Sequence, residues 1–221
     1  MSSGVSKKGL FVTLEGGEGA GKSTQIDMLK QKLEEAGFEV VSTREPGGTQ
    51  GAEIIRDVIL SGAAEAYGPE YEASLFAAAR LDHVENLISP SLTAGKIVLC
   101  DRFIDSTRVY QGITGRVDMD YLHALEKVVC GMCMPDKTIV LDLEPEEGMK
   151  RATTRRSSDV SPDRFEKEKL EIQVKRREAF LSIAKQEPDR CMVVDASGSP
   201  DEVHANIWDG LSPTIDRLTS K

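Results

Sequence analysis

The chain has 221 residues, of which 39% are hydrophobic and 29% charged, and its formal net charge is −9. This length and apolar content suffice for one hydrophobic core, so we predict a single domain over residues 1–221. A negative chain lacks the broad basic face that nucleic acids require, so nucleic acid is not an expected partner. The polar start at Met1 has no apolar signal core, and no apolar run reaches membrane-spanning length. We therefore expect a cytoplasmic protein with no membrane partner.

A glycine-rich segment follows the apolar run Leu10–Leu14 and matches the pattern G-x-x-x-x-G-K-[ST]. Its residues are Gly16, Gly17, Glu18, Gly19, Ala20, Gly21, Lys22, Ser23 and Thr24. Glycines let successive backbone N–H groups turn toward a polyphosphate, and the start of the following helix adds partial positive charge. Lys22 would reach the β- and γ-phosphates, and Ser23 would ligate Mg²⁺. The alternative is a flexible glycine-rich turn without a ligand.

Strand-like and helix-like segments alternate along the chain, which predicts a doubly wound parallel sheet. The helix over 22–36 carries an apolar stripe of Ile26, Leu29, Leu33 and Ala36. Further strands are predicted over 38–43, 96–102, 138–143 and 191–195. Further helices are predicted over 52–60, 70–88 (closed by Ser89-Pro90), 120–129, 145–156 and 201–211, with another long helix opening at 163–166.

Charged residues stand where two of these strands end. Arg44 follows the second strand, and Asp101 and Arg102 close the apolar run from Lys96. Ligands of open α/β sheets gather at the carboxyl ends of strands, so these three are candidate site residues. Arg102 could bind a phosphate bidentately, and Asp101 could orient an arginine or a metal-bound water. A salt bridge that only closes the strand is the alternative.

Phe76 and Arg80 are four residues apart on one predicted helix and share a face. A ring and a guanidinium placed in this way could stack on a flat heterocycle and donate to its carbonyl oxygen. A phenylalanine at helical spacing is more often a core residue, so the pattern leaves both readings open.

A second group of cations, Lys150, Arg151, Arg155 and Arg156, precedes the polar stretch 157–162. A basic flap of this kind could close over a triphosphate and exclude water, although a solvated basic turn has the same pattern. Asp142 ends the strand over 138–143 like a Walker B acid. Cys130 and Cys133 have the spacing of half a zinc site or a redox pair, but without a second pair we favour reduced structural cysteines.

The order of these segments resembles the bacterial thymidylate kinase family over nearly the whole chain. The resemblance is carried by the phosphate loop, Arg44-Glu45-Pro46-Gly47-Gly48-Thr49, Phe76 with Arg80, Asp101-Arg102-Phe103, Ser106-Thr107, Tyr110-Gln111-Gly112 and Asp163-Arg164-Phe165-Glu166. It implies a three-layer P-loop kinase fold with a five-stranded parallel sheet and a helical lid over about 151–165. It also implies a homodimer that transfers the γ-phosphoryl group of ATP to dTMP, giving dTDP and ADP.

The resemblance also implies residue roles. Phe76 would stack on thymine, Arg80 would bond its O4, Thr107 would read the base edge and Tyr110 would crowd the sugar 2′ position. The implied catalytic residues are Lys22, Arg102, Arg155 and Glu18. The acceptor would be bound by Glu18, Arg44, Pro46, Arg56, Phe76, Arg80, Arg102, Ser106, Thr107, Tyr110 and Gln111. ATP would be bound by the loop residues 16–24 with Arg151, Arg155 and Arg156, and Mg²⁺ by Ser23 and Asp101.

Three questions stay open on the sequence. The segment 156–162 is longer and richer in serine than the family's short lid, so the choice among Arg151, Arg155 and Arg156 is undecided. A kinase of another nucleoside monophosphate would share the phosphate features and differ at Phe76, Arg80, Thr107 and Tyr110. A nucleotide-driven switch is the third reading, although the chain lacks an Asn-Lys-x-Asp guanine motif.

Overall fold

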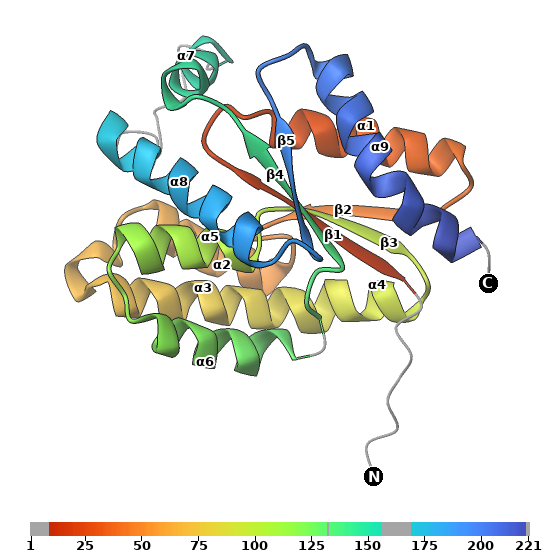
Figure 1. The fold of residues 1–221 in the computed structure, drawn as a ribbon. Coiled ribbons are helices and arrows are strands. Elements are labelled where there is room, and N and C mark those ends of the chain that lie inside the picture. The colour runs from red at the N-terminus through yellow and green to blue at the C-terminus, as the bar shows by residue number, and fades with distance from the viewer. Residues whose placement is uncertain (1–8, 132, 156–168, 220–221) are drawn as a thin grey trace.

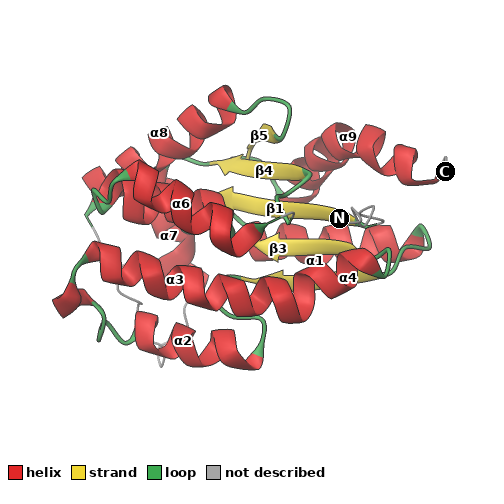
Figure 2. Cartoon of the chain, turned by 90° about the horizontal axis from the view of Figure 1, so that it is seen from below, coloured by secondary structure: helices red, strands yellow, loops and turns green. Residues whose placement is uncertain are grey.

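The computed structural model describes residues 9–131, 133–155 and 169–219. A five-stranded sheet lies at its centre, and its strand order is β2-β3-β1-β4-β5 (Figures 1 and 2). The strands are β1 (Leu10–Gly16), β2 (Val40–Arg44), β3 (Ile97–Asp101), β4 (Lys137–Asp142) and β5 (Cys191–Asp195). All four pairings between neighbours are parallel. The predicted three-layer α/β fold is confirmed.

Helices cover both faces of the sheet (Figure 1). One face packs against α1 (Lys22–Glu35) and α9 (Pro200–Thr219). The other packs against α3 (Pro69–His83), α4 (Ser89–Thr93), α5 (Ile104–Thr107), α6 (Met119–Cys130) and α8 (Leu170–Gln186). The helix α2 (Gln50–Leu60) lies beside α3, and α7 (Pro145–Arg155) follows β4 (Figure 2). Three short irregular turns are η1 (Glu65–Tyr67), η2 (Val84–Ile88) and η3 (Arg108–Thr114).

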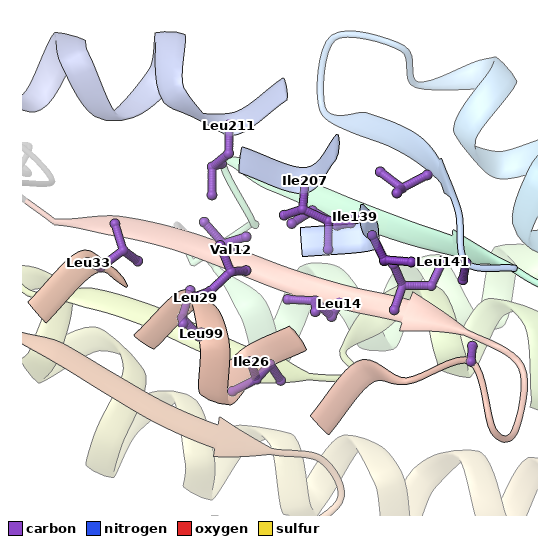
Figure 3. Close-up of a cluster of buried hydrophobic side chains, with 14 of the residues drawn as sticks. Val12, Leu14, Ile26, Leu29, Leu33, Leu99, Ile139, Leu141, Ile207 and Leu211 are labelled. Carbon is purple, nitrogen blue, oxygen red and sulfur yellow. The ribbon is translucent and has the colours of Figure 1, made fainter. Parts of the chain in front are cut away.

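The core between the sheet and α1 and α9 follows from the apolar periodicity of the sequence (Figure 3). Side chains of β1 alternate between faces, so Val12 and Leu14 both point toward α1. Ile26, Leu29 and Leu33 of α1 pack against them, as the helical stripe predicts. Ala36 is exposed instead, because α1 ends at Glu35 before the stripe reaches it.

Two helix ends differ from the sequence prediction. Ser89-Pro90 does not close the helix that begins at Pro69, because the chain passes through a π-helical turn, η2, into α4. Pro90 lies at the start of α4, where a missing N–H costs no hydrogen bond. The last helix continues past Leu211 to Thr219, because Ile215 extends the buried stripe of Val203 and Ile207. Within the described residues no helix is both long and apolar enough to cross a membrane.

The register between the strands determines where the candidate site lies on the sheet. Leu14 and Arg44 each pair with Asp101, and Gly16 pairs with Leu141. The carboxyl ends of β1, β2, β3 and β4 therefore meet at one edge of the sheet. β1 lies between β3 and β4, so the direction in which strands are added reverses at β1. A crevice forms at the carboxyl end of a parallel sheet where this reversal occurs. Here the crevice opens beside the glycine loop, through which the chain passes from β1 to α1.

A buried charge network under this edge holds α5 against β4 and β5. Asp105 is fully buried and accepts two hydrogen bonds from Arg190, at 2.7 and 2.9 Å, and one from Arg108 at 3.3 Å. Arg108 also contacts Glu126 and Glu187. Removing the shared carboxylate would take the most deeply buried anion of the network away from two guanidinium groups and leave them to Glu126 and Glu187.

We expect Asp105→Ala to lower the free energy of unfolding by about 3–5 kcal/mol, the usual cost of breaking a buried ion pair. Urea denaturation at neutral pH measures this. The matched control is Asp27→Ala, an exposed aspartate on α1, which should change stability by less than about 0.5 kcal/mol. Equal stabilities for the two variants would contradict the importance of the network.

Candidate active site

A cavity of about 300 Å³ opens at the carboxyl ends of β1, β2 and β3. Its walls come from the glycine loop, the segment after β2, the helices α2 and α3, and the segment after β3. Every residue that the sequence analysis assigned to the acceptor lines it. The lining is Glu18, Gly19, Gly21, Lys22, Ser23, Arg44, Glu45, Pro46, Arg56, Leu60, Phe76, Arg80, Asp101, Arg102, Phe103, Ser106, Thr107, Tyr110 and Gln111.

The glycine loop holds its lysine close to its own backbone. Lys22 Nζ donates to the carbonyl oxygens of Gly16 at 3.2 Å and Gly17 at 2.9 Å. Burial lowers the pKa of Lys22, and the neighbouring charge of Arg102 lowers it further. The adjacent Ser23 hydroxyl donates to Asp101 Oδ2 at 2.8 Å. Ser23 and Asp101, the two residues predicted to bind Mg²⁺, are therefore in contact. Each has an oxygen atom, which is the type of ligand that Mg²⁺ prefers.

Arg102 lies at the centre of the cavity. Its guanidinium donates to Glu18 Oε1 at 2.6 Å, to the Gly16 carbonyl oxygen at 3.1 Å and to Ser106 Oγ at 3.2 Å. The ring of Tyr110 lies 5.1 Å from it. The backbone of Arg102 has φ of +69°, a left-handed conformation that is uncommon outside glycine. This turn carries the chain out of β3 and back toward the glycine loop.

Glu15, which the sequence analysis did not single out, fixes the segment after β3. It is fully buried at the end of β1 and accepts hydrogen bonds from Phe103 N at 2.7 Å and Ser106 N at 3.3 Å. The Ser106 hydroxyl donates to it at 2.6 Å. Burial raises the pKa of Glu15, and the negative charge of Asp105 adds to the shift.

Glu18 is the acidic residue of the glycine loop. Its carboxylate accepts from Arg102 and from the Tyr110 hydroxyl, the latter at 3.2 Å. Although burial alone would raise it, the charges of Arg102 and Lys22 lower the pKa of Glu18 to about 2. Glu18 is therefore ionised at neutral pH and offsets part of the cationic charge in the cavity.

This pKa predicts a pH-dependent contribution to stability. A depressed carboxyl pKa stabilises the fold fully above the unfolded value of 4.5, and the contribution is lost as pH falls toward 2. We expect the stability advantage of the wild type over Glu18→Gln to shrink by roughly 2 kcal/mol between pH 7 and pH 3. Urea unfolding at both pH values measures it, with the exposed Glu146→Gln on α7 as the control. A constant advantage would contradict the shift.

The far end of the cavity is built by α3 and the segment after β3. Phe76 is half-buried, and Arg80 is buried and donates to Thr107 Oγ1 at 3.1 Å. Burial would lower the pKa of Arg80, but the charge of Glu45 raises it. Gln111 donates to Glu72 at 2.7 Å. Phe76 packs against a core cluster and also borders the cavity, so the interpretation of Phe76 as a core residue describes only part of its surroundings.

The segment after β2 forms the remaining wall. Arg44 makes two hydrogen bonds to Glu53, at 2.8 and 3.1 Å, and its side chain is 52% exposed. Arg56 of α2 donates to the Pro46 carbonyl oxygen at 2.6 Å. Both guanidinium groups therefore stand at the cavity with partners that hold them in place.

A second cavity of about 310 Å³ lies beside the same loop. It is lined by Gly19, Ala20, Gly21, Thr24, Gln25, Arg151, Ala196, Gly198, Pro200 and Val203. Arg151 of α7 donates to the carbonyl oxygens of Ala196 at 2.9 Å and Ser197 at 3.1 Å. The two cavities share Gly19 and Gly21, so they meet at the glycine loop.

Other candidate residues are not joined to these cavities. Asp142 accepts from Arg177 at 2.6 and 3.2 Å, so this strand-end acid is engaged in an ion pair. The four cysteines are free and buried, and the described residues contain no group of three or more metal-ligating side chains. Arg155 ends α7, while Arg156, the stretch 157–162 and the predicted helix start at 163 lie outside the described residues. The roles of Arg155 and Arg156 stay predictions.

Comparison with known proteins identifies the family. Residues 14–207 match the family model described as thymidylate kinase. The chain belongs to the thymidylate kinase family. Two thymidylate kinases, from Bradyrhizobium sp. strains BTAi1 and ORS 278, are each 52% identical to it over 204 residues, which cover 92% of this chain and 90% of each relative.

The solved structures agree. The crystal structure of thymidylate kinase from Ehrlichia chaffeensis matches with a TM-score of 0.74 and 32% identity, over 92% of this chain and 98% of that one. The segment matched by the thymidylate kinase model begins in β1 and ends in α9. It therefore includes every residue that lines the two cavities.

Proposed function

We propose that this chain is an ATP-dependent dTMP kinase that transfers the γ-phosphoryl group of ATP to dTMP, giving dTDP and ADP for dTTP synthesis. The observation that carries the proposal is the meeting of two cavities at one phosphate loop. The loop residues Gly19 and Gly21 border both cavities, and Lys22 borders the first one. Two nucleotides bound on the two sides would have their phosphates end to end.

In this proposal the first cavity, at the carboxyl ends of β1, β2 and β3, binds dTMP. Phe76 stacks on the thymine, Arg80 and Thr107 face its carbonyl edge, and Tyr110 excludes a 2′-hydroxyl. The acceptor phosphate lies between Arg102 and Arg44, and Glu18 contacts the acceptor's sugar or a metal-bound water. The volume of about 300 Å³ and the presence of Phe76 one helical turn from the buried guanidinium of Arg80 suit one nucleoside monophosphate.

The second cavity binds ATP, with the adenosine between Arg151 and the loop 196–200. Arg151 lines this cavity, which supports a role as a lid cation, and Arg155 and Arg156 stay predicted ATP contacts. Ser23 and Asp101 are the residues that would hold Mg²⁺, since their oxygens are 2.8 Å apart beside the phosphate loop. When bound, the ion neutralises phosphate charge.

The chain's own residues supply position and positive charge rather than a base. A phosphate monoester with a second pKa near 6 is mostly dianionic at neutral pH, so the acceptor needs no deprotonation. Two anions must instead be brought together in line, which Arg102 and Lys22 achieve from the two sides of the loop. Glu18 orients Arg102 through their 2.6 Å contact.

We also propose that the chain forms a homodimer, acts in the cytoplasm and folds as one domain with a lid over about 151–165. Exposed apolar side chains on neighbouring helices, Leu81 of α3 and Tyr121 and Val128 of α6, support a subunit interface. Light scattering should give twice the mass of one chain.

A panel of acceptors tests the activity. Production of ADP should be measured with dTMP, dUMP, UMP, CMP and AMP at equal concentration, with ATP and Mg²⁺. We expect dTMP to be the best acceptor. A stronger response to another monophosphate would favour a different nucleotide kinase, and ATP hydrolysis that forms no phosphorylated nucleotide would favour a switch protein.

A further inference from the structure

A buried carboxylate connects the base end of the first cavity to the loop after β2. Glu45 follows β2 and is buried. Its Oε2 accepts from Arg80 Nε at 2.8 Å, and its Oε1 accepts from His83 Nδ1 at 2.9 Å. Arg80 and His83 are three residues apart on α3, so they present donors to the two oxygens of one carboxylate. Each oxygen of Glu45 thus has a donor from the same helix.

The side of the His83 ring that faces away from Glu45 is also fixed by contacts. Its ring is fully buried, and Nε2 lies 2.7 Å from Thr43 Oγ1 at the end of β2. Gly48 packs against the ring, and a Cβ at this position would lie 2.7 Å from Nε2. The ring cannot swing away without displacing the loop, so Nδ1 stays directed at Glu45.

Arg80 is fixed by these contacts in one orientation. Nε is bound to Glu45, Nη2 donates to Thr107 at 3.1 Å, and the guanidinium lies 5.0 Å from the Phe103 ring. No described residue accepts a hydrogen bond from Nη1, and Arg80 lines the cavity. An N–H donor that cannot rotate discriminates between a carbonyl oxygen and an amino group on the base. The carbonyl oxygen can accept its hydrogen bond, whereas the amino group is itself a donor and would leave the guanidinium N–H without an acceptor.

We propose that His83 and Glu45 are positioning residues that determine base specificity. They hold Arg80 so that its free donor meets a carbonyl oxygen at the base edge, as in thymine or uracil, and rejects the exocyclic amino group of cytosine. This inference rests on the proposed function. It assigns a role to a buried histidine and to a buried glutamate whose two carboxylate oxygens bind Arg80 and His83.

Glu45→Gln is the first test, because the amide keeps the shape of the carboxylate but turns an NH₂ group toward one of the two donors. Binding of dTMP should weaken by about 10- to 100-fold, as expected when a charge-assisted hydrogen bond in a buried site is lost. Binding of 2-deoxyribose 5-phosphate, which lacks the base, should stay within about twofold. Calorimetric and NMR titrations of the full chain measure the two ligands.

A pair of histidine variants gives the second test and decides the matter if Glu45→Gln does not fold. The amide nitrogen of His83→Asn can replace Nδ1 as the donor to Glu45, whereas His83→Leu offers none. We expect the ratio of kcat/KM for dTMP over dCMP to fall at least about tenfold in His83→Leu and to be largely restored in His83→Asn.

The outcomes separate the two hypotheses. A wild-type protein that does not prefer dTMP over dCMP would overturn the proposed function. A selective wild type with an equally selective His83→Leu would overturn only the positioning role. The positioning role also fails if the variants lose affinity for deoxyribose 5-phosphate as strongly as for dTMP, because that result indicates general damage to the cavity.

Discussion

Replacing Lys22 by alanine should lower kcat for dTMP phosphorylation by about 10³-fold, while the KM for dTMP stays within about threefold of the wild type. The amino group lies over the carbonyl oxygens of Gly16 and Gly17, and Lys22 lines the first cavity beside Gly19 and Gly21, which border both cavities. A positive charge at this position interacts most strongly with the phosphoryl group during its transfer, because the equatorial oxygens of that group carry the developing negative charge. Most of the loss should therefore appear in turnover.

Steady-state rates against dTMP concentration at saturating ATP separate kcat from KM. The matched control is Lys30→Ala, which removes a partly exposed lysine of the same helix that pairs with Glu34. It should leave both constants unchanged. A Lys22→Ala enzyme with near-normal turnover, or one whose whole defect lies in the KM for dTMP, would contradict the assigned role.

Replacing Arg102 by alanine should lower kcat/KM for dTMP by about 10⁴-fold, through a rise in KM as well as a fall in kcat. Arg102 contacts Glu18, Gly16 and Ser106 together, so it orients the loop, and we propose that it also orients the acceptor phosphate. Arg102→Lys should recover only a small part of the loss, since one ammonium group cannot reproduce the planar, bidentate donor set. The KM for ATP should change little in either variant.

A double variant distinguishes lost chemistry from lost stability. Arg102→Ala leaves the Glu18 carboxylate without its cation, and Glu18→Gln removes that unpaired charge. The double variant should regain stability in urea relative to Arg102→Ala but remain inactive. Recovery of activity together with stability would show that Arg102 acts by maintaining the fold.

The sequence by itself predicted which segments would surround a bound polyphosphate. The glycine loop is a contiguous pattern, and the charged ends of the predicted strands share one edge because parallel strands have the same direction. Arg44, Asp101 and Arg102 could therefore be assigned to the site without coordinates, and all three line the cavity. The five strands are also readable locally, since buried parallel strands are short apolar runs.

Only the tertiary structure decided which polar residues support the site. Helical spacing places Phe76 and Arg80 on one face but does not say what that face meets. Glu15 stands between an apolar run and the glycine loop, and Glu45 and His83 are 38 positions apart, yet their contacts of 2.7–2.9 Å hold the site together. No local sequence pattern identifies such pairs. A buried charge is stable in the low-dielectric interior only when hydrogen-bond donors contact it, and here the donors come from segments that are distant in the sequence.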